Sequence, residues 1–237
     1  MNETGGVPAP RRNLYGRRHG KALRPAQRRL LAELLPRLRV PGVAAPGDPA
    51  RAAVDPVALF GDARPVWIEI GFGAGEHLVH QAARHPELGL IGCEPFVNGV
   101  AAALGRIAAA GVGNVRLHPG DARDLIELLP DGALARVFLL YPDPWPKARH
   151  HRRRFVSEEN LAMLARAMAR GAELRLATDI PDYVEHALAA VEAAEGWSVV
   201  APEADRGVPW PEWPGTRYEA KAVREGRRPH YLTFRRD

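Results

Sequence analysis

The sequence predicts an α/β protein built on a doubly wound, mostly parallel sheet of about seven strands with helices on both faces. Short apolar runs alternate along the chain with longer segments in which apolar residues recur at helical spacing. In addition, the apolar run 66–70 is followed at once by a glycine turn and a helical segment. Both observations indicate parallel βαβ units, in which each helix carries the chain back across the sheet.

The N-terminal residues 1–24 are predicted to be a flexible basic arm, and residues 25–237 are predicted to form a single domain. The arm contains Arg11, Arg12, Arg17 and Arg18 among its basic residues. They belong either to a solvated tail or to an arm that folds onto RNA phosphates. Leucines recur at helical spacing from Pro25 to Leu38, which predicts a basic N-terminal helix. Residues 40–64 are rich in Pro, Gly, Ala and Asp and are predicted to be a connector.

The first half of the sheet is predicted to contain three strands. The predicted strands lie at residues 66–70, 88–93 and 115–118. The helices that follow them are predicted at residues 76–84, 97–110 and 122–129. Glycine punctuates this half: a glycine turn precedes the first helix, and Gly111 and Gly113 end the alanine-rich second helix.

The second half contributes four more strands, predicted at residues 137–141, 173–177, 197–201 and 228–235. The run Val137–Tyr141 is unbroken and apolar, which is typical of a parallel strand covered on both faces. Ser157 is a good N-cap for a helix that reaches Met168. Pro181 is suited to the first turn of a helix that leads to Ala194.

The composition is that of an ordinary globular protein, with 46% hydrophobic and 26% charged residues. No apolar run approaches the roughly 20 residues that span a bilayer, and the polar N-terminus does not resemble a secretory signal. The single cysteine, Cys93, excludes an internal disulfide and a cysteine-based zinc cluster. We therefore expect a reduced, cytoplasmic setting and no membrane partner.

Charge is unevenly distributed along the chain, although the net charge is only +5. Residues 1–65 carry 12 Lys and Arg against 5 Asp and Glu, whereas residues 66–135 carry 4 against 8. Residues 136–171 are again basic, with 8 against 3. An acidic centre with basic flanks indicates a small-molecule site beside a surface that binds a polyanion. The alternative is that arginine merely reflects a coding bias.

The glycine turn and the strand-end acids together predict the kind of ligand. Glycines at 71, 73 and 75 follow the first strand, and they allow a backbone to approach a nucleotide-like ligand. The dinucleotide pattern G-x-G-x-x-G would need glycine where Glu76 stands. Four predicted strand ends carry an acid: Glu69, Glu94, Asp121 and Asp143. We expect these acids to form a ring with no lysine or arginine near it, which disfavours a pyrophosphate and suits the cationic S-adenosylmethionine. Alternatively, some of the acids only cap the following helices.

The loop after the fourth strand carries the most specific chemistry. Prolines at 142, 144 and 146 exclude both helix and sheet and stiffen the chain. They present a carboxylate (Asp143), an indole (Trp145) and an ammonium (Lys147). Trp145 is predicted either to stack on a base or to plug the loop to the core. The arginines that follow are predicted to contact RNA phosphates or to form a solvated face; they are Arg149, Arg152, Arg153 and Arg154.

Histidines do not indicate a metal site, because none is grouped with carboxylates at the spacing of metal ligands. We therefore expect no metal. His77 and His80, on one predicted helix, are expected to face solvent or the core.

Five stretches of the sequence resemble the bacterial tRNA (guanine-N7-)-methyltransferases. They are Glu69-Ile-Gly-Phe-Gly-Ala-Gly75, Gly92-Cys-Glu-Pro95, Tyr141-Pro-Asp-Pro-Trp-Pro-Lys147, Thr178-Asp179 and Thr216-Arg-Tyr-Glu219. The Pro-Asp-Pro-Trp element before a lysine and an arginine run is highly specific, whereas G-x-G-x-G is shared by many methyltransferases. One departure is Pro146, where a polar residue is expected in relatives.

This resemblance implies a Rossmann-like class I methyltransferase fold and S-adenosylmethionine as methyl donor. It also implies methylation of the variable-loop guanine at position 46 of tRNA, which forms 7-methylguanosine. Cofactor-site positions are implied at Glu69, Glu94, Asp121 and Asp143, together with the glycines Gly71, Gly73 and Gly75, and Asp143 is also the implied catalytic acid. The implied tRNA contacts are Lys147, Asp179, Thr216, Arg217, Tyr218 and Glu219. Whether the protein is a monomer or a homodimer is left open.

The sequence disfavours three other functions. A nicotinamide-dependent oxidoreductase conflicts with Glu76 and with the acids at the strand ends. An amino-methyltransferase that acts on nucleic-acid bases would carry a second proline directly after Pro144, where Trp145 stands. A non-enzymatic RNA-binding protein would leave the glycine turn and the strand-end acids without a purpose.

Overall fold

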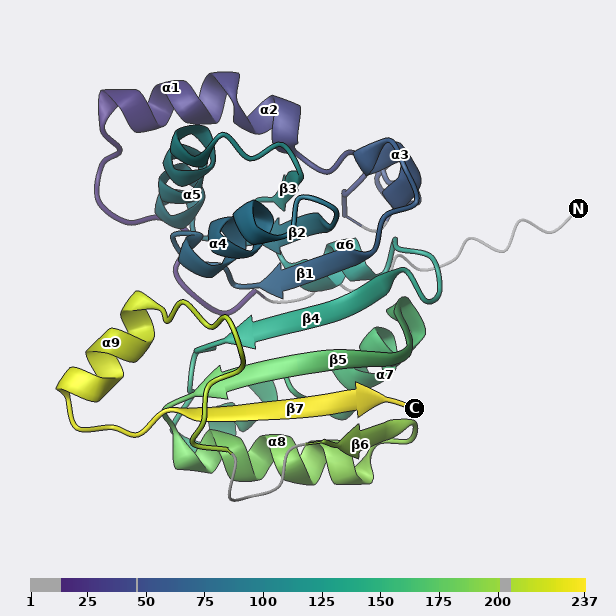
Figure 1. Cartoon of the computed structure of the whole chain (residues 1–237), viewed down its shortest axis with the longest axis vertical. Helices are drawn as coiled ribbons and strands as arrows, with labels where there is room; N and C mark the ends of the chain where they lie inside the picture. Colours follow the sequence, from purple (N-terminus) through teal and green to yellow (C-terminus); the bar gives the residue numbers. More distant parts are fainter. Residues whose placement is uncertain (1–13, 46, 201–205) are drawn as a thin grey trace, which may run out of the picture.

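The computed structural model describes residues 14–45, 47–200 and 206–237 (Figure 1). Over these residues the strands form a seven-stranded sheet with the order β3-β2-β1-β4-β5-β7-β6. The strands are β1 (Val66–Ile70), β2 (Gly89–Cys93), β3 (Val115–His118), β4 (Leu134–Leu140), β5 (Met168–Thr178), β6 (Trp197–Val199) and β7 (His230–Arg236). All pairs are parallel except those that β7 makes with β5 and β6. The predicted doubly wound, mostly parallel sheet is confirmed.

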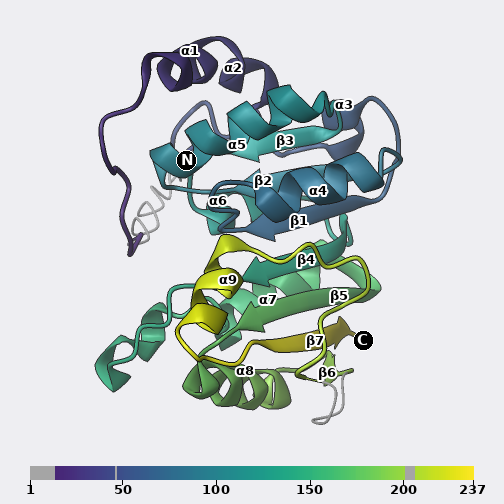
Figure 2. The same cartoon turned by 60° about the vertical axis from the view of Figure 1, so that its left-hand side comes forward.

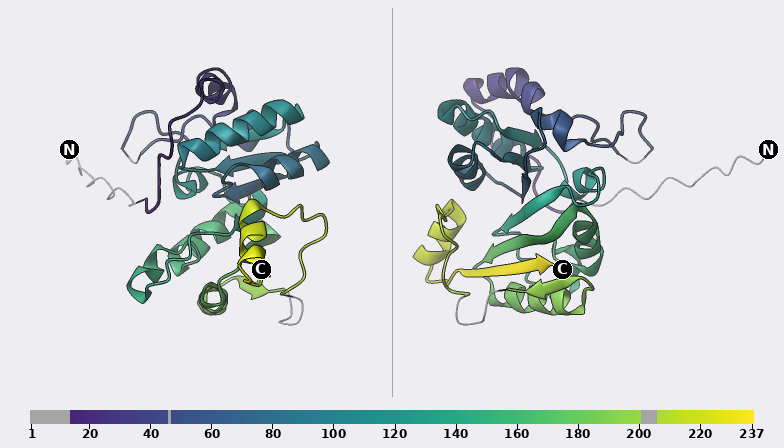
Figure 3. Two further views of the ribbon diagram at one scale, coloured as in Figure 1. Left: turned by 90° about the vertical axis from the view of Figure 1, so that its left-hand side faces the viewer. Right: turned by 45° about the vertical axis from the view of Figure 1, so that its right-hand side comes forward.

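Helices cover both faces of the sheet. Their bounds are α1 (Pro25–Glu33), α2 (Leu35–Leu38), α3 (Pro56–Phe60), α4 (Glu76–Arg84), α5 (Val97–Ala110), α6 (Ala122–Ile126), α7 (Glu158–Ala167), α8 (Pro181–Ala193) and α9 (Arg217–Arg224), with a 3-10 helix η1 (Ala148–Arg153). Helices α4 and α5 pack on β1 to β3, and α1 packs on the outside of α5. Figure 3 shows α1 and α5 stacked at one end of the molecule and α8 at the other. Helices α6, α7 and α8 pack on the opposite face.

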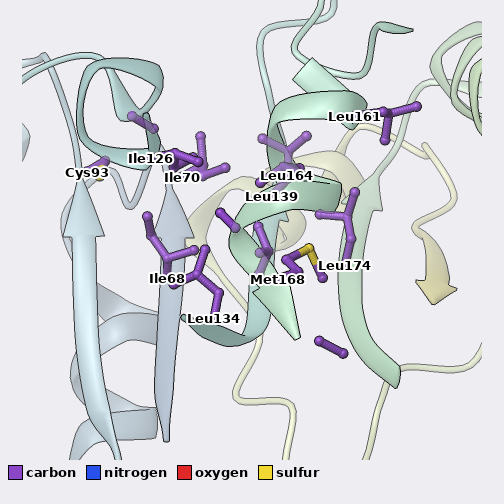
Figure 4. Packing of buried hydrophobic residues seen from close by; sticks show 14 of the residues in the cluster. Ile68, Ile70, Cys93, Ile126, Leu134, Leu139, Leu161, Leu164, Met168 and Leu174 are labelled. Atoms are coloured by element: carbon purple, nitrogen blue, oxygen red, sulfur yellow. The ribbon is translucent and has the colours of Figure 1, made fainter. Parts of the chain in front are cut away.

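The side chains of β1 and β4 point alternately to the two faces of the sheet, and both faces are covered. Ile68 and Leu139 point into the large core beneath α6, α7 and α8, where Leu161 of α7 joins them (Figure 4). Phe138 and Leu140 point to the other face. There, no helix lies over β4, β5 and β7 among the described residues. Instead, tryptophans from the segment 206–216 cover that face, and helix α9 lies beyond the carboxyl ends of β4 and β5 (Figure 1).

Several element boundaries differ from the sequence-based expectations. The predicted helix 25–38 is divided into α1 and α2 at Leu34, because Pro36 has no N–H to continue the helical ladder. Strand β5 begins at Met168, which the sequence assigned to the preceding helix. Helix α9 was not predicted at all. Of the predicted strand 197–201, residue 201 lies outside the described residues.

The described part of the N-terminal arm, residues 14–24, runs beside the start of α5. The Val97 N–H donates to the carbonyl of Arg18 at 3.0 Å, and the Asn98 amide accepts from Gly20 N–H and donates to the carbonyl of Lys21. Arg11 and Arg12 lie outside the described residues. The division into an arm and a single domain stays a prediction. None of the helices in the described residues is long and apolar enough to cross a membrane.

Candidate active site

A cavity of about 480 Å³ opens at the carboxyl ends of β1, β2 and β4, the edge at which open α/β sheets bind their ligands. Its volume lies within the range of small-molecule sites, roughly 300–1,000 Å³. Gly71 follows β1, Glu94 follows β2 and Asp143 follows β4, and all three line the cavity. Figure 2 shows this edge of the sheet turned toward the viewer, with α9 in front of the ends of β4 and β5. The parallel topology therefore brings together three segments that are distant in sequence.

The glycine turn adopts backbone conformations that favour glycine at all three positions. Gly71, Gly73 and Gly75 have φ angles of 74°, 58° and 77°, in the left-handed region that side chains with a Cβ rarely adopt. A Cβ on Gly71 would meet no atom within 4 Å, so this backbone is open toward the cavity. Gly75 does not line the cavity; a Cβ there would stand 2.8 Å from Ala103 Cβ, so Gly75 permits α4 to pack on α5.

Glu94 ties the glycine turn to the second strand. Its Oε2 accepts a 2.7 Å hydrogen bond from Gly73 N–H, and its Oε1 accepts a 2.9 Å bond from Phe96 N–H. The side chain is buried, and burial raises the pKa of Glu94 against the opposing effect of these two N–H donors. Each carboxylate oxygen retains a further acceptor position, so Glu94 can also accept from ligand hydroxyls.

Glu69 does not line the cavity, although the sequence placed it among the cofactor residues. It is buried on the other side of the glycine turn, where its Oε2 lies 2.8 Å from Nδ1 of His77. The other ring nitrogen of His77 lies 3.2 Å from the side-chain amide of Gln81. Glu69 therefore anchors the start of α4. His77 was expected to face either solvent or the core, and in the structure it is buried in the core.

Asp121 both lines the cavity and caps a helix. It accepts from Arg123 N–H at 3.0 Å as the N-cap of α6, and the Arg123 guanidinium binds its carboxylate at 2.6 Å. The alternative that this acid serves as a helix cap thus holds alongside its place in the cavity. The expectation that no cation lies near the acids was wrong. Arg123 lies beside Asp121, and the fold also brings Arg17 and the arginines at residues 152–154 to the cavity.

The loop after β4 is held in an unusual conformation. Tyr141 and Trp145 have φ angles of 50° and 44°, which are uncommon for residues other than glycine. Asp143 stands exposed at the cavity mouth, and partial burial of its carboxyl group raises its pKa. Trp145 is half-buried and belongs to none of the core clusters. The Arg153 guanidinium packs over both its ring and that of Tyr15, at 4.8 and 4.4 Å from the centroids.

The arginines after this loop have different surroundings. Arg149 and Arg152 are exposed, as is Lys147. Arg154 is only 2% exposed. Its Nε donates to the carbonyl of Pro144 at 3.1 Å, and its Nη atoms bind the carbonyl and carboxylate of Asp182. The structure therefore gives Arg154 a role other than the expected phosphate contact, since protein acceptors occupy its guanidinium and hold the loop to α8.

The residues implied to contact tRNA are also partly engaged by protein groups. Asp179 pairs with Arg227, and Thr216 caps α9 by accepting from Glu219 N–H at 3.1 Å. Arg217 and Tyr218 lie against Gly73, since a Cβ there would be 3.3 Å from each side chain. Among these implied positions, only Tyr218 lines the cavity.

Gly99 belongs to this site and was missed by the sequence analysis. A Cβ at Gly99 would stand 2.4 Å from the carbonyl oxygen of Gly73, so the first turn of α5 fits against the glycine turn only without a side chain. Its position in the first turn of the alanine-rich helix, five residues after Glu94, was the available signal. Within the described residues, His, Cys, Asp and Glu side chains form no group of three that could hold a metal ion.

Comparison with known proteins assigns the family. A family profile described as "Putative methyltransferase" matches residues 63–232. The tRNA (guanine-N(7)-)-methyltransferase of Paracoccus denitrificans is 61% identical over 96% of this chain and 96% of its own length. The enzyme of the same name from Cereibacter sphaeroides is 59% identical over 95% of this chain and 91% of its own.

The chain belongs to the bacterial tRNA (guanine-N7-)-methyltransferase family. Among solved structures, a mutant of the 16S rRNA (adenine(1408)-N(1))-methyltransferase from Catenulisporales acidiphilia has a TM-score of 0.53 at 19% identity. The match extends over 84% of this chain and 97% of that enzyme. The 16S rRNA methyltransferase KamB also has a TM-score of 0.53 at 19% identity, over 84% of this chain and 99% of its own. These two likenesses show the class I methyltransferase fold. Family membership and fold together imply use of S-adenosylmethionine.

Proposed function

We propose that this chain transfers a methyl group from S-adenosylmethionine to N7 of guanine 46 in the variable loop of tRNA, forming 7-methylguanosine. The observation that carries the proposal is the meeting of Gly71, Glu94 and Asp143 around one cavity, in a chain whose relatives are named for this reaction. The single cysteine, Cys93, and a tRNA substrate support a cytoplasmic location.

The residues of the cavity fit the methyl donor. Gly71 leaves space for a ligand against its backbone, and Glu94 retains acceptor positions for ribose hydroxyls. The cavity carries the carboxylates of Glu94, Asp121 and Asp143, which suit a ligand with an ammonium and a sulfonium. When bound, S-adenosylmethionine supplies an electrophilic methyl group. Of the arginines at the cavity, Arg123 and Arg154 are already paired with Asp121 and Asp182.

The protein's task is to orient the acceptor base and to stabilise charge. Guanine N7 has a free lone pair at neutral pH, so no base has to remove a proton from it. Alignment of N7 with the methyl group and exclusion of water contribute roughly 7–11 kcal/mol in well-oriented reactions. Asp143 is the proposed catalytic residue, because a carboxylate at the cavity mouth stabilises the positive charge that develops on the purine. The same carboxylate can accept from the N1–H and N2–H₂ edge of guanine.

The surface beside the cavity is proposed to bind the tRNA backbone. Lys147, Arg149 and Arg152 are exposed beside the Asp143 loop, where they can contact phosphates and set the position of the variable loop. Arg154 serves this surface indirectly by holding the carbonyl of Pro144.

Nucleoside analysis tests the function directly. Bulk tRNA that lacks 7-methylguanosine is incubated with the purified protein and S-adenosylmethionine, then digested and analysed by mass spectrometry. We expect 7-methylguanosine to be the nucleoside that gains mass, and a tRNA with guanine 46 replaced by adenine to remain unmodified. Methylation of another nucleoside, or unchanged methylation of the replaced tRNA, would overturn the proposal.

A further inference from the structure

One carboxylate oxygen of Glu219 accepts hydrogen bonds from two other segments of the chain. The hydroxyl of Tyr141 donates to Oε2 at 3.0 Å, and Nε1 of Trp213 donates to the same atom at 2.7 Å. Tyr141 directly follows β4, Trp213 lies in the segment that covers the sheet, and Glu219 is in the first turn of α9. Glu219 therefore joins three segments beside the cavity.

Aromatic packing fixes the position of the Trp213 donor. Its ring lies 5.5 Å from Trp210, 5.8 Å from Tyr231 and 5.3 Å from His77, measured between centroids. The indole of Trp210 is itself fixed by a 2.9 Å hydrogen bond to Oγ1 of Thr233 in β7. The acceptor oxygen of Glu219 is thus held against the sheet by a packed indole.

Tyr141 is the point at which the chain turns from β4 into the Asp143 loop. Its N–H still pairs with the carbonyl of Ala177 at 2.7 Å, yet its φ is 50°. A residue with a Cβ keeps such a conformation only where its surroundings enforce it. The hydroxyl bond to Glu219 is one such constraint, and Asp143 follows only two residues later. Burial and the neighbouring Glu219 carboxylate raise the pKa of Tyr141, so the hydroxyl keeps its proton.

The same helix turn also reaches the glycine turn. Arg217 and Tyr218, which immediately precede Glu219, lie against Gly73, and Tyr218 lines the cavity. The contacts of Glu219 thus connect the wall of the proposed methyl-donor site with the loop that carries the proposed catalytic carboxylate.

We propose that Glu219 is a positioning residue, which fixes the Asp143 loop relative to the methyl-donor cavity through Tyr141 and Trp213, and that it does not contact RNA. This inference rests on the proposed function, since it assigns the groups that align the same reaction. A displacement of the loop by about 1 Å is enough to slow a reaction about 10²-fold.

The test compares rate with affinity in Glu219→Ala, Glu219→Gln, Tyr141→Phe and the double variant Tyr141→Phe/Glu219→Ala. We expect Glu219→Ala to slow single-turnover methyl transfer by about 10²-fold, with tRNA dissociation constants within about threefold of the parent's. Glu219→Gln retains an acceptor oxygen and should recover most of the rate. Tyr141→Phe should add little to Glu219→Ala, because the two residues share one interaction. Glu185→Gln removes an exposed carboxylate of α8 and serves as the control.

A second readout needs no substrate. Amide hydrogen exchange in residues 141–147 should be faster in Glu219→Ala and Tyr141→Phe than in the parent, and unchanged in Glu185→Gln. Parallel losses of tRNA affinity and rate in Glu219→Ala, additive effects in the double variant, or unchanged exchange in the loop would each overturn the positioning role. The nature of the nucleoside formed by the parent is a separate measurement, so failure of the proposed function is recognised independently.

Discussion

Gly99 lies directly against Gly73, because a Cβ on Gly99 would stand 2.4 Å from the Gly73 carbonyl oxygen and 3.3 Å from Cγ of Glu94. The first turn of α5 therefore supports the glycine turn and the carboxylate that holds it. No flexible side chain stands between the two backbones, so a substituent at Gly99 has to displace one of them.

Gly99→Ala should weaken S-adenosylmethionine binding by displacing the Gly73 peptide, whose N–H is bonded to Glu94. Overpacking of this kind typically destabilises a protein by about 1–3 kcal/mol. Titration calorimetry and urea denaturation measure the two effects. Gly105→Ala is the matched control in the same helix, since the nearest atom to its Cβ would be Cδ1 of Leu30, at 3.9 Å. Equal cofactor affinity in both variants would show that α5 does not set the glycine turn.

Asp143→Asn should lower the single-turnover rate by about 10²–10³-fold, the usual effect of losing one preorganised electrostatic partner. The amide keeps the shape of the side chain but removes the charge that faces the purine. Asp143→Ala should be slower still, because it also leaves the guanine edge without an acceptor. Quenched-flow measurement of methylated tRNA provides the rates, and an Asn variant within threefold of the parent would contradict the catalytic assignment.

The pH dependence of the same step tests whether the Asp143 carboxylate has to be ionised. Burial raises the pKa of Asp143, so the carboxylate is lost as the pH falls through that raised value. The rate should therefore decline on the acidic side and stay level between about pH 6.5 and 8.5, well above the ordinary Asp pKa of about 3.9. The Asn variant should run parallel to the parent over that window. An acidic limb that persists unchanged in Asp143→Asn would show that another group titrates and would contradict this prediction.

The arginines that follow the Asp143 loop should divide into two classes when tRNA affinity is measured at increasing salt concentration. Arg149→Ala and Arg152→Ala should each flatten the slope of log affinity against log salt by about 0.7–0.9, as the loss of one phosphate contact does. Arg154→Ala should leave this slope unchanged and instead destabilise the fold by about 1–3 kcal/mol, because the buried guanidinium donates to the Pro144 carbonyl and to Asp182. Filter binding and urea denaturation measure the two quantities. Slopes that change equally in all three variants would contradict the division.

His118 should make the protein less stable in acid. Both of its ring nitrogens are buried, and burial lowers the pKa of His118 from 6.5 to about 4. Between these values the unfolded chain takes up a proton that the folded chain does not, so the free energy of unfolding falls as the pH falls. The free energy of unfolding of His118→Leu, relative to that of the parent, should therefore increase by about 2 kcal/mol between pH 7.5 and pH 5. Urea denaturation measures this difference, and a pH-independent change in stability in His118→Leu would contradict the titration.

The sequence predicted the sheet well because buried parallel strands leave a simple signal. Runs such as Val137–Tyr141 are apolar without interruption and are bounded by proline or glycine. The turn at Gly71–Gly75 and the acids Glu94 and Asp143 were placed at the correct edge, since the carboxyl ends of parallel strands meet there. Topology alone was sufficient for these residues.

The remaining parts of the site depend on contacts between distant segments. Nothing local distinguishes Arg154 from Arg152, yet only Arg154 meets Asp182 on α8. Likewise, Glu69 turns to His77 because its strand alternation points it away from the cavity. Helix α9 did have a local signal: Thr216 followed by Glu219 has the spacing of a capping box, and Thr216 does cap the helix. The prolines and tryptophans that precede it concealed that pattern.

The position of β7 has a consequence for how this protein is synthesised. Strand β6 pairs with β7 alone, and β7 also pairs with β5. On the ribosome, β6 emerges before β7, so it has no strand partner until residues 230–236 have left the exit tunnel. Until then the nascent chain exposes one edge of β5, and the tryptophans that pack on Tyr231 lack that part of the surface that they cover. Completion of the sheet and of the aromatic cover is therefore one late event. A ribosome that stalls before residue 230 holds a chain with an unpaired sheet edge, which can pair with strands of other chains.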